Sequence, residues 1–165
     1  MNALTNEEKL TNYETLSHIK NVSVLLTEMS KKLIDRASEH DNSKLVSPEV
    51  EIFTEFTPKL SKCTYGSDEY NEYLKEMKVA LDHHYSKNSH HPEHYENGIN
   101  DMDILDLFEM LCDWKAATLR HNDGDIYKSI EINSKRFGYG EQLKKILLNT
   151  VPLLNSVKLK DQHSN

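Results

Sequence analysis

The chain has 165 residues, with 27 acidic against 20 basic side chains and a formal net charge of −7. This acidic balance disfavours the broad basic surface that duplex nucleic acid requires, and no apolar run approaches the roughly 20 residues of a membrane-spanning helix. The N-terminal stretch MNALTNEEKL resembles neither a signal peptide nor a transit peptide, and Cys63 and Cys112 provide no disulfide framework. These features predict a globular protein of the cytoplasm, without a membrane as partner.

The first third of the chain carries two helix signals. Apolar side chains recur every three or four positions through residues 6–37, which predicts a long amphipathic helix. Thr5 and Glu8 have the spacing of a capping box at its start. Ser47 and Pro48 supply a cap and a proline at the first helical position, so we expect a second helix from there to about Leu60.

The middle of the chain predicts a helix that leads into a histidine-rich loop. Ser67 can cap this helix, whose apolar face includes Met77 and Leu81 and continues to His84. The stretch DHHYSKNSHHPEH, residues 82–94, contains five histidines. Pro92 stiffens the second part of this stretch, which is predicted to be a loop.

The last part of the chain predicts three further helices. Asp101 can cap a helix that runs to about His121, and Asp123 can cap one that runs to Phe137. A glycine-rich turn at 138–140 precedes a last helix over 141–149. Few residues alternate with the period of a strand, so we predict an all-α, compact single-domain bundle of about six helices. The domain should cover residues 1–150, and a flexible tail should cover 151–165.

Histidines and acids outside the loop can complete a metal site. His18 lies in the first long helix, and the dipeptide His40-Asp41 follows that helix. Asp113 lies in an otherwise apolar helix with Glu109 one turn before it, and two acids at this spacing repel each other unless a cation or a partner lies between them. Neutral imidazoles and carboxylates are ligands that Mn, Fe, Co, Ni and Zn accept. The sequence therefore predicts a site for a divalent metal ion.

Helical phase distinguishes the first two histidines of the loop region. His84 follows Met77 and Leu81 on the apolar face, which predicts that it points inward, whereas His83 lies nearer the flank. In the second pair, the spacing leaves both His90 and His91 open as ligands.

The ordered set formed by His18, His40-Asp41, two histidines of the loop and Asp113 resembles the metal-dependent HD phosphohydrolase superfamily. The segments HDNSK, HHYSKNSHHPEHY, EMLCDWKAA and SIEINSKRF are similar to an HD-like family of phage and bacterial proteins, over about residues 15–150. The resemblance implies a helical fold with one or two divalent ions, including Mg among the candidates, in the cytoplasm of a bacterium or a phage-infected cell. The ligands that it implies are His18, His40, Asp41, His84, His91 and Asp113.

The resemblance also implies hydrolysis of a phosphate ester or anhydride, most often in a nucleotide. A divalent metal lowers the pKa of bound water and polarises a phosphoryl oxygen. Asp41 would ligate or bridge the metal, Lys44 could contact the phosphate as a point charge, and Glu93 or His94 could protonate the leaving group. The side chains expected to bind the substrate are Lys44, His90, Lys115 and Arg136.

Several alternatives stay open at the level of sequence. A mononuclear site could use only His18, His40, Asp41 and Asp113, with the histidine-rich loop contacting the substrate instead. A second reading is a di-iron oxygenase, because the same residue order is similar to the inositol-oxygenase branch of the HD fold. A third is a non-catalytic protein that binds a metal or another ligand. A homodimer is compatible with all three.

Overall fold

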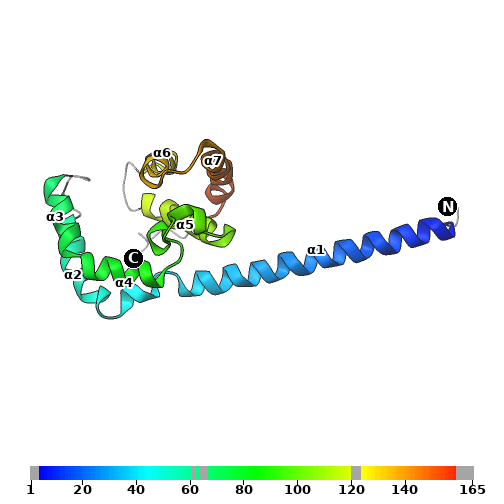
Figure 1. The fold of residues 1–165 in the computed structure, drawn as a ribbon, viewed down its shortest axis with the longest axis horizontal. Helices are drawn as coiled ribbons and strands as arrows, with labels where there is room; N and C mark the ends of the chain where they lie inside the picture. Colours follow the sequence, from blue (N-terminus) through cyan, green and yellow to red (C-terminus); the bar gives the residue numbers. More distant parts are fainter. Residues whose placement is uncertain (1–3, 61, 64–66, 120–123, 159–165) are drawn as a thin grey trace. The chain divides into compact units, whose positions relative to one another are not determined.

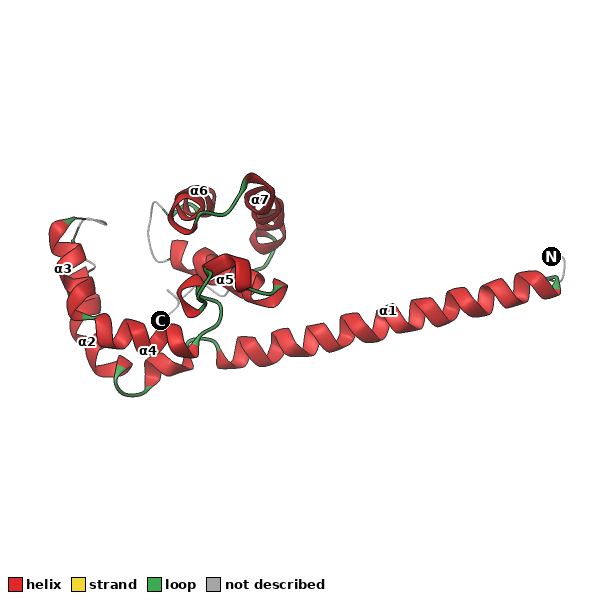
Figure 2. Ribbon diagram, in the orientation of Figure 1, coloured by secondary structure: helices red, strands yellow, loops and turns green. Residues whose placement is uncertain are grey.

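The computed structural model describes residues 4–60, 62–63, 67–119 and 124–158, and this part of the chain is helical without a strand (Figures 1 and 2). Its α-helices are α1 (Asn6–Glu39), α2 (Glu49–Leu60), α3 (Asp68–Glu76), α4 (Lys78–Lys87), α5 (Ile104–Thr118), α6 (Ile126–Phe137) and α7 (Glu141–Asn155). Three short 3-10 helices are η1 (Asn42–Leu45), η2 (Pro92–His94) and η3 (Gly98–Asp101). The predicted all-α class is confirmed. None of the described helices is both long enough and apolar enough to span a membrane.

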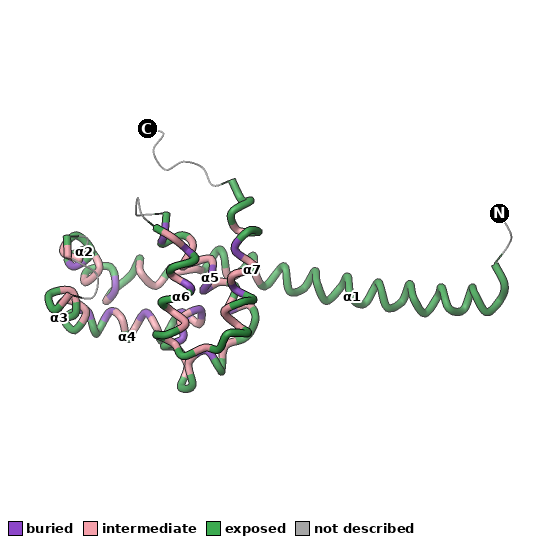
Figure 3. The backbone as a smooth tube through the Cα atoms, turned by 90° about the horizontal axis from the view of Figure 1, so that it is seen from above, coloured by how far each residue is buried: buried purple, intermediate pink, exposed green. Residues whose placement is uncertain are grey.

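The chain divides into two units, Met1–His40 and Asp41–Asn165. The first unit consists of α1, which begins with the predicted capping box. The Glu8 N–H donates to Thr5 Oγ1 at 3.2 Å, and the Thr5 N–H donates to Glu8 Oε2 at 2.7 Å. α1 contains no buried residue (Figure 3).

The first half of the second unit packs α2 against α3 and α4. Ser67 caps α3 as predicted, because its hydroxyl accepts the Tyr70 N–H at 3.2 Å. The prediction of one helix continuing from Ser67 to His84 is wrong. The helix ends at Glu76 and α4 begins at Lys78, because Met77 has ψ near 0° instead of a helical value. Met77 is buried at this junction.

The start of α5 differs from the prediction. Asp103, not Asp101, is the N-cap, and its carboxylate accepts the N–H groups of Leu105 and Asp106 at 2.7 and 2.9 Å. Asp101 instead closes a turn by accepting the Asn97 N–H at 3.1 Å.

Asp123, the predicted cap of the next helix, lies outside the described residues. Asp125 is the N-cap of α6 and accepts the N–H groups of Tyr127 and Lys128.

The main core joins α5, α6 and α7. Its buried members are Leu111, Ile126, Ile130, Leu147 and Val151. The α7 helix continues through Pro152 to Asn155, beyond the predicted end at 149. Val151 explains this extension, because its side chain is fully buried in the core and holds the last turns of α7 in place.

Candidate metal centre

Asp41 begins the second unit at a sharp turn of the backbone. Its φ of 57° and ψ of 13° lie in the left-handed region, where no other described non-glycine residue lies. Aspartate tolerates this conformation better than most residues because its short side chain can form local hydrogen bonds. Surrounding structure must hold such a residue in place, and residues of this kind concentrate at functional sites.

Three histidines gather at the end of α4. His84 lies in the last turn of α4 and is 2% exposed. His90 and His91 follow in the loop, which folds back because the buried Asn88 side chain donates to the His84 carbonyl at 2.8 Å and to Ser43 Oγ at 2.8 Å. The ring centroid of His91 consequently lies 4.7 Å from that of His84 and 4.1 Å from that of His90.

The imidazole Nε2 atoms converge on Asp41. Asp41 Oδ1 lies 3.4 Å from His84 Nε2 and 3.6 Å from His90 Nε2. His91 Nε2 lies 2.9 Å from His84 Nε2. One ligand atom from each of the four side chains falls within 4.8 Å of the others. Ligands at about 2.1 Å from a tetrahedral ion lie about 3.4 Å from one another, so these four residues could hold a metal ion.

One fully buried carboxylate and one half-buried carboxylate contact the Nδ1 atoms of these histidine rings, on the side of each ring opposite to Nε2. Glu49 is fully buried, and its Oε2 lies 2.8 Å from His84 Nδ1 while its Oε1 lies 2.7 Å from His83 Nδ1. Glu109 Oε1 lies 3.1 Å from His90 Nδ1. Because an ionised carboxylate only accepts, it assigns the proton to Nδ1 and directs the Nε2 lone pair of His84 and of His90 toward Asp41. Metal-ligating histidines are commonly oriented by carboxylates in this way.

The surroundings of His84 and His91 favour the neutral form of these two imidazoles. Burial lowers the pKa of His91 to about 3, and the neighbouring His90 and His84 add to this effect while Asp113 opposes it. Burial also lowers the pKa of His84, and the positive charge of Lys44 contributes in the same direction. A neutral imidazole is the form that binds a metal ion, so the site favours the ligand state of both rings.

Asp106 fixes the loop that carries His90 and His91. This buried carboxylate accepts the Ser89 hydroxyl through Oδ1 at 2.7 Å and the Tyr95 hydroxyl through Oδ2 at 2.7 Å. The same Oδ2 accepts the Asp103 N–H at 3.0 Å. Burial and the hydrogen bond to Asp106 raise the pKa of Tyr95 to about 12. The loop between α4 and α5 is therefore tied to the first turn of α5 on both sides of the paired histidines.

Lys44, expected from the sequence to contact a phosphate, lies beside the four-residue cluster. Its Nζ lies 2.6 Å from Asp41 Oδ2, the carboxylate oxygen that does not face the histidines. The same ammonium group lies 5.8 Å from the centre of the Phe53 ring. Its side chain is partly exposed, so a positive charge is available at the edge of the site.

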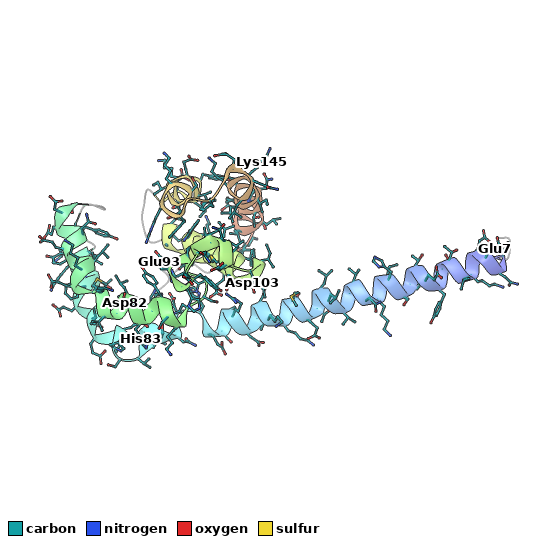
Figure 4. All side chains as sticks on the ribbon, viewed as in Figure 1. Glu7, Asp82, His83, Glu93, Asp103 and Lys145 are labelled. Atoms are coloured by element: carbon teal, nitrogen blue, oxygen red, sulfur yellow. The ribbon has the colours of Figure 1, made fainter. Side chains whose placement is uncertain are left out.

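Three of the other side chains predicted for catalysis or substrate binding, Glu93, His94 and Arg136, have partners outside the four-residue cluster. Glu93 Oε1 accepts from Arg136 Nη2 at 2.7 Å, and His94 Nδ1 lies 2.7 Å from the Tyr85 carbonyl oxygen. Figure 4 shows Glu93 in the connection between α4 and α5, with His83 on α4. Lys115 lines a separate pocket with Asp125 and other residues around the start of α6. His90, predicted to bind substrate, belongs to the four-residue cluster instead of its rim.

The first unit carries His18 and His40. His40 is the C-cap of α1, and its N–H donates to the Arg36 carbonyl at 2.8 Å. His18 is exposed in the middle of α1. At 1.5 Å per residue the helix separates His18 from His40 by about 33 Å, and Asp41 is bonded directly to His40. While α1 is continuous, His18 and Asp41 of one chain are too far apart to share an ion.

Asp113 is half-buried on α5, and its negative charge acts on His91. The sequence missed Glu49 as a partner of the histidines, because its position at the start of α2 suggested only a favourable charge at a helix N-terminus. One feature of the sequence pointed to a role for Glu109, namely its spacing of one helical turn from Asp113. No feature of the sequence pointed to Ser43 and Asn88, which form a hydrogen bond with each other beside His84.

The fold and the site together define an all-α protein with a candidate metal centre of three histidines and one aspartate. The chain belongs to DUF5662, a family of unknown function, whose model matches residues 7–160. Neither a curated protein nor a solved structure matches the chain. The family description specifies no fold and no reaction, so the resemblance to HD phosphohydrolases and the chemistry that it implies stay predictions.

Proposed function

We propose that this protein binds a divalent transition metal ion through Asp41, His84, His90 and His91 and hydrolyses a phosphate ester or anhydride. The observation that carries the metal proposal is the convergence of three imidazole Nε2 atoms and Asp41 Oδ1, with Glu49 and Glu109 on the opposite nitrogens of two rings. Three imidazoles with one carboxylate favour Mn, Fe, Co, Ni or Zn over Mg, which prefers oxygen ligands.

The proposal of hydrolysis is supported by two further arguments, the resemblance to HD enzymes and the position of Lys44. A bound divalent ion supplies Lewis acidity and lowers the pKa of water. Lys44 lies next to Asp41, so its ammonium group can exchange its bond to Asp41 Oδ2 for a bond to a phosphoryl oxygen. Glu49 and Glu109 keep the imidazoles oriented. A nucleotide is the proposed substrate class because it offers such a phosphoryl group.

Metal binding is tested with the purified chain and Asp41→Asn, a variant that retains the shape of the side chain and removes its charge. Asp82→Asn, at an exposed acid on α4, is the matched control. We expect the wild type and the control to bind about one Co²⁺ or Mn²⁺ per site tightly, and Asp41→Asn to bind at least tenfold more weakly. Equal affinity in all three proteins would refute the site.

Turnover is tested on a panel of nucleoside mono-, di- and triphosphates and simple phosphate esters with added Mn²⁺, Co²⁺, Ni²⁺ or Mg²⁺. We expect phosphate release that depends on the metal and that falls at least a hundredfold in Asp41→Asn. Metal binding without turnover on any substrate would favour a non-catalytic role. An iron-dependent absorbance band with oxygen uptake would replace the hydrolase proposal by an oxygenase.

A further inference from the structure

The three side chains that were expected to act as a general acid or to bind substrate, and that have partners outside the four-residue cluster, meet at Tyr85. His94 Nδ1 lies 2.7 Å from the Tyr85 carbonyl oxygen, and this imidazole nitrogen donates because a carbonyl oxygen only accepts. At the other end of the same residue, the Arg136 guanidinium donates a hydrogen bond to the Tyr85 hydroxyl. Glu93 Oε1 in turn accepts from Arg136 Nη2 at 2.7 Å. Tyr85 is thus held through both its backbone and its side chain.

The ring of Tyr85 packs against two of the histidines that could bind a metal ion. Its centroid lies 5.2 Å from that of His91 and 6.0 Å from that of His84. The His91 ring also contacts the His84 and His90 rings, which belong to the cluster itself. Tyr85 is therefore a neighbour of His91 that does not belong to the cluster and can restrict where the imidazole lies.

Arg136 is anchored to the core of the second unit. Its guanidinium carbon lies 4.7 Å from the centre of the Phe137 ring, a distance typical of a cation–π contact. Phe137 is stacked on Trp114, with ring centroids 6.2 Å apart and an interplanar angle of 7°. Trp114 packs against the main core of α5, α6 and α7. A line of contacts consequently leads from the core through Arg136 and Tyr85 to His91.

The charges around the Tyr85 hydroxyl agree with this arrangement. Burial raises the pKa of Tyr85 and the negative charge of Glu93 adds to the rise, whereas the charge of Arg136 and its hydrogen bond lower it. The ion pair between Glu93 and Arg136 is half-exposed, and pairs of this kind add little to the stability of a fold. Removing the pair should therefore leave the protein folded, so an effect on the metal centre can be measured.

We propose that Tyr85, Arg136 and Glu93 are positioning residues that together hold His91 at the metal centre. This inference rests on the proposed metal site and specifies what orients one of its ligands. His84 and His90 are oriented by the carboxylates of Glu49 and Glu109. His91 is oriented by the packed ring of Tyr85, which Arg136 and Glu93 keep in place.

This role differs from the catalytic and substrate-binding roles that the sequence suggested for the same side chains. A general acid needs a proton to give, and a phosphate-binding arginine needs donors directed at the substrate. Glu93 and Arg136 instead bind each other, and the Arg136 guanidinium also donates to Tyr85. Both groups then act on the metal centre through His91 and make no contact with the substrate.

The proposal is tested by Co²⁺ titration of the purified full chain and of Tyr85→Phe and Arg136→Met. Tyr85→Phe keeps the ring and removes the hydroxyl, and Arg136→Met keeps an aliphatic stem and removes the donors. We expect both to bind Co²⁺ about 3–10-fold more weakly, a smaller effect than loss of a group that contacts a ligand directly. Tyr127→Phe and Lys135→Met, at exposed positions on α6, are the matched controls and should bind as the wild type does.

The visible absorption spectrum of bound Co²⁺ separates positioning from a general loss of stability. This spectrum depends on the number and arrangement of the ligands. At saturating Co²⁺, Tyr85→Phe and Arg136→Met should have bands that differ from those of the wild type in position or intensity. Weaker binding with an unchanged spectrum and a lowered Tm of the metal-free protein would show that the three residues only stabilise the fold, and would overturn the proposal.

The dependence of Glu93 on Arg136 is tested by combining Glu93→Met with Arg136→Met. If Glu93 acts through Arg136, the double variant should bind Co²⁺ about as weakly as Arg136→Met alone. Glu131→Met, which removes an exposed carboxylate of α6 from its ion pair with Lys144, is the control and should leave the affinity unchanged. A double variant whose loss equals the product of the two single losses would contradict a common action of the pair.

The remaining outcomes distinguish this inference from the proposed function. Wild-type affinity and spectrum in Tyr85→Phe and Arg136→Met overturn the positioning role, while the metal centre still stands if Asp41→Asn binds weakly. Lost phosphate release with unchanged Co²⁺ binding in Glu93→Met would favour its predicted role as a general acid and would also overturn the inference. A wild-type chain that binds no Co²⁺ overturns the proposed function and this inference together. Weaker binding, altered spectra and the common action of Glu93 and Arg136 support it.

Discussion

Glu49 occupies a position where one side chain orients two rings. It is fully buried and contacts His83 Nδ1 and His84 Nδ1 with different oxygens, while the Ser43 hydroxyl donates to Oε2 at 3.1 Å. A carboxylate with three such partners has little freedom to rotate. The orientation of His84, and with it the direction of its Nε2 lone pair, therefore depends on Glu49.

Replacing Glu49 by glutamine should weaken metal binding. The amide keeps the shape but offers only one accepting oxygen, so one of the two imidazoles loses its acceptor. We expect the metal dissociation constant to rise about 10–100-fold, measured by Co²⁺ or Mn²⁺ titration. Glu51→Gln, at an exposed position on α2, is the control and should match the wild type. An unchanged constant in Glu49→Gln would show that this carboxylate does not orient a ligand.

Tyr95 should lose its proton at a higher pH than an ordinary tyrosine. Its pKa is raised to about 12 by burial and by the hydrogen bond to Asp106, against about 10 for an ordinary tyrosine. The folded state therefore holds this proton more tightly than the unfolded state. The resulting stability is complete below about pH 10 and is lost as the pH rises through about 12.

The measurement is an absorbance titration of tyrosinate together with denaturation at several pH values. Tyr95→Phe should remove one late-titrating group and reduce the loss of stability above pH 10. At neutral pH it should cost about 1–2 kcal/mol, because the bond to a carboxylate is lost. Tyr13→Phe, at an exposed position on α1, is the control. A Tyr95→Phe protein whose late titration equals that of the wild type would contradict the assignment.

At the scale of elements, the end of α7 shows how packing outweighs a local signal. Proline removes a helical hydrogen bond, so Pro152 favours an early end of the helix, and the end predicted from the sequence was at 149. The helix nevertheless reaches Asn155, because Val151 packs against the core residues of α5 and α6. The last turns of α7 are thus held by tertiary contacts.

Replacing Val151 by alanine should destabilise the second unit by about 2 kcal/mol, since the lost methyl groups leave a cavity in a packed core. Val157→Ala, past the end of α7 and 57% exposed, should cost less than about 0.5 kcal/mol. Urea denaturation followed by circular dichroism measures both values. Equal effects of the two substitutions would mean that the end of α7 is not packed.

For the molecule as a whole, metal binding should be linked to stability. An ion that binds the folded chain at a hundredfold excess over its dissociation constant adds about 2.7 kcal/mol. For a chain of this size that corresponds to a rise in Tm of about 5–10 °C. Differential scanning fluorimetry with and without Mn²⁺ or Co²⁺ measures the shift, and a chelator should reverse it. The shift should be absent in Asp41→Asn, and a wild-type Tm insensitive to every metal would refute the linkage.

The helical class followed from local information. The three-four spacing of apolar residues and the caps at Thr5 and Ser67 act within one or two turns, so they are readable from the sequence. The break at Met77 was not readable, because its apolar side chain continues the helical pattern while its backbone leaves the helix. Such a junction is decided by the packing of α2 against both α3 and α4.

The sequence by itself determined the helical class and indicated residue types that can ligate a metal ion, because periodicity, capping and ligand chemistry are properties of nearby residues. Only the tertiary structure decided which histidines converge. It set His84, His90 and His91 around Asp41, and it brought Glu49 and Glu109 to the opposite ring nitrogens. These contacts join residues as far apart in the chain as Asp41 and His90, 49 positions, and their geometry depends on a folded loop that Asn88 and Asp106 hold. Short-range patterns carry no information about such a pairing, because it arises from packing between elements.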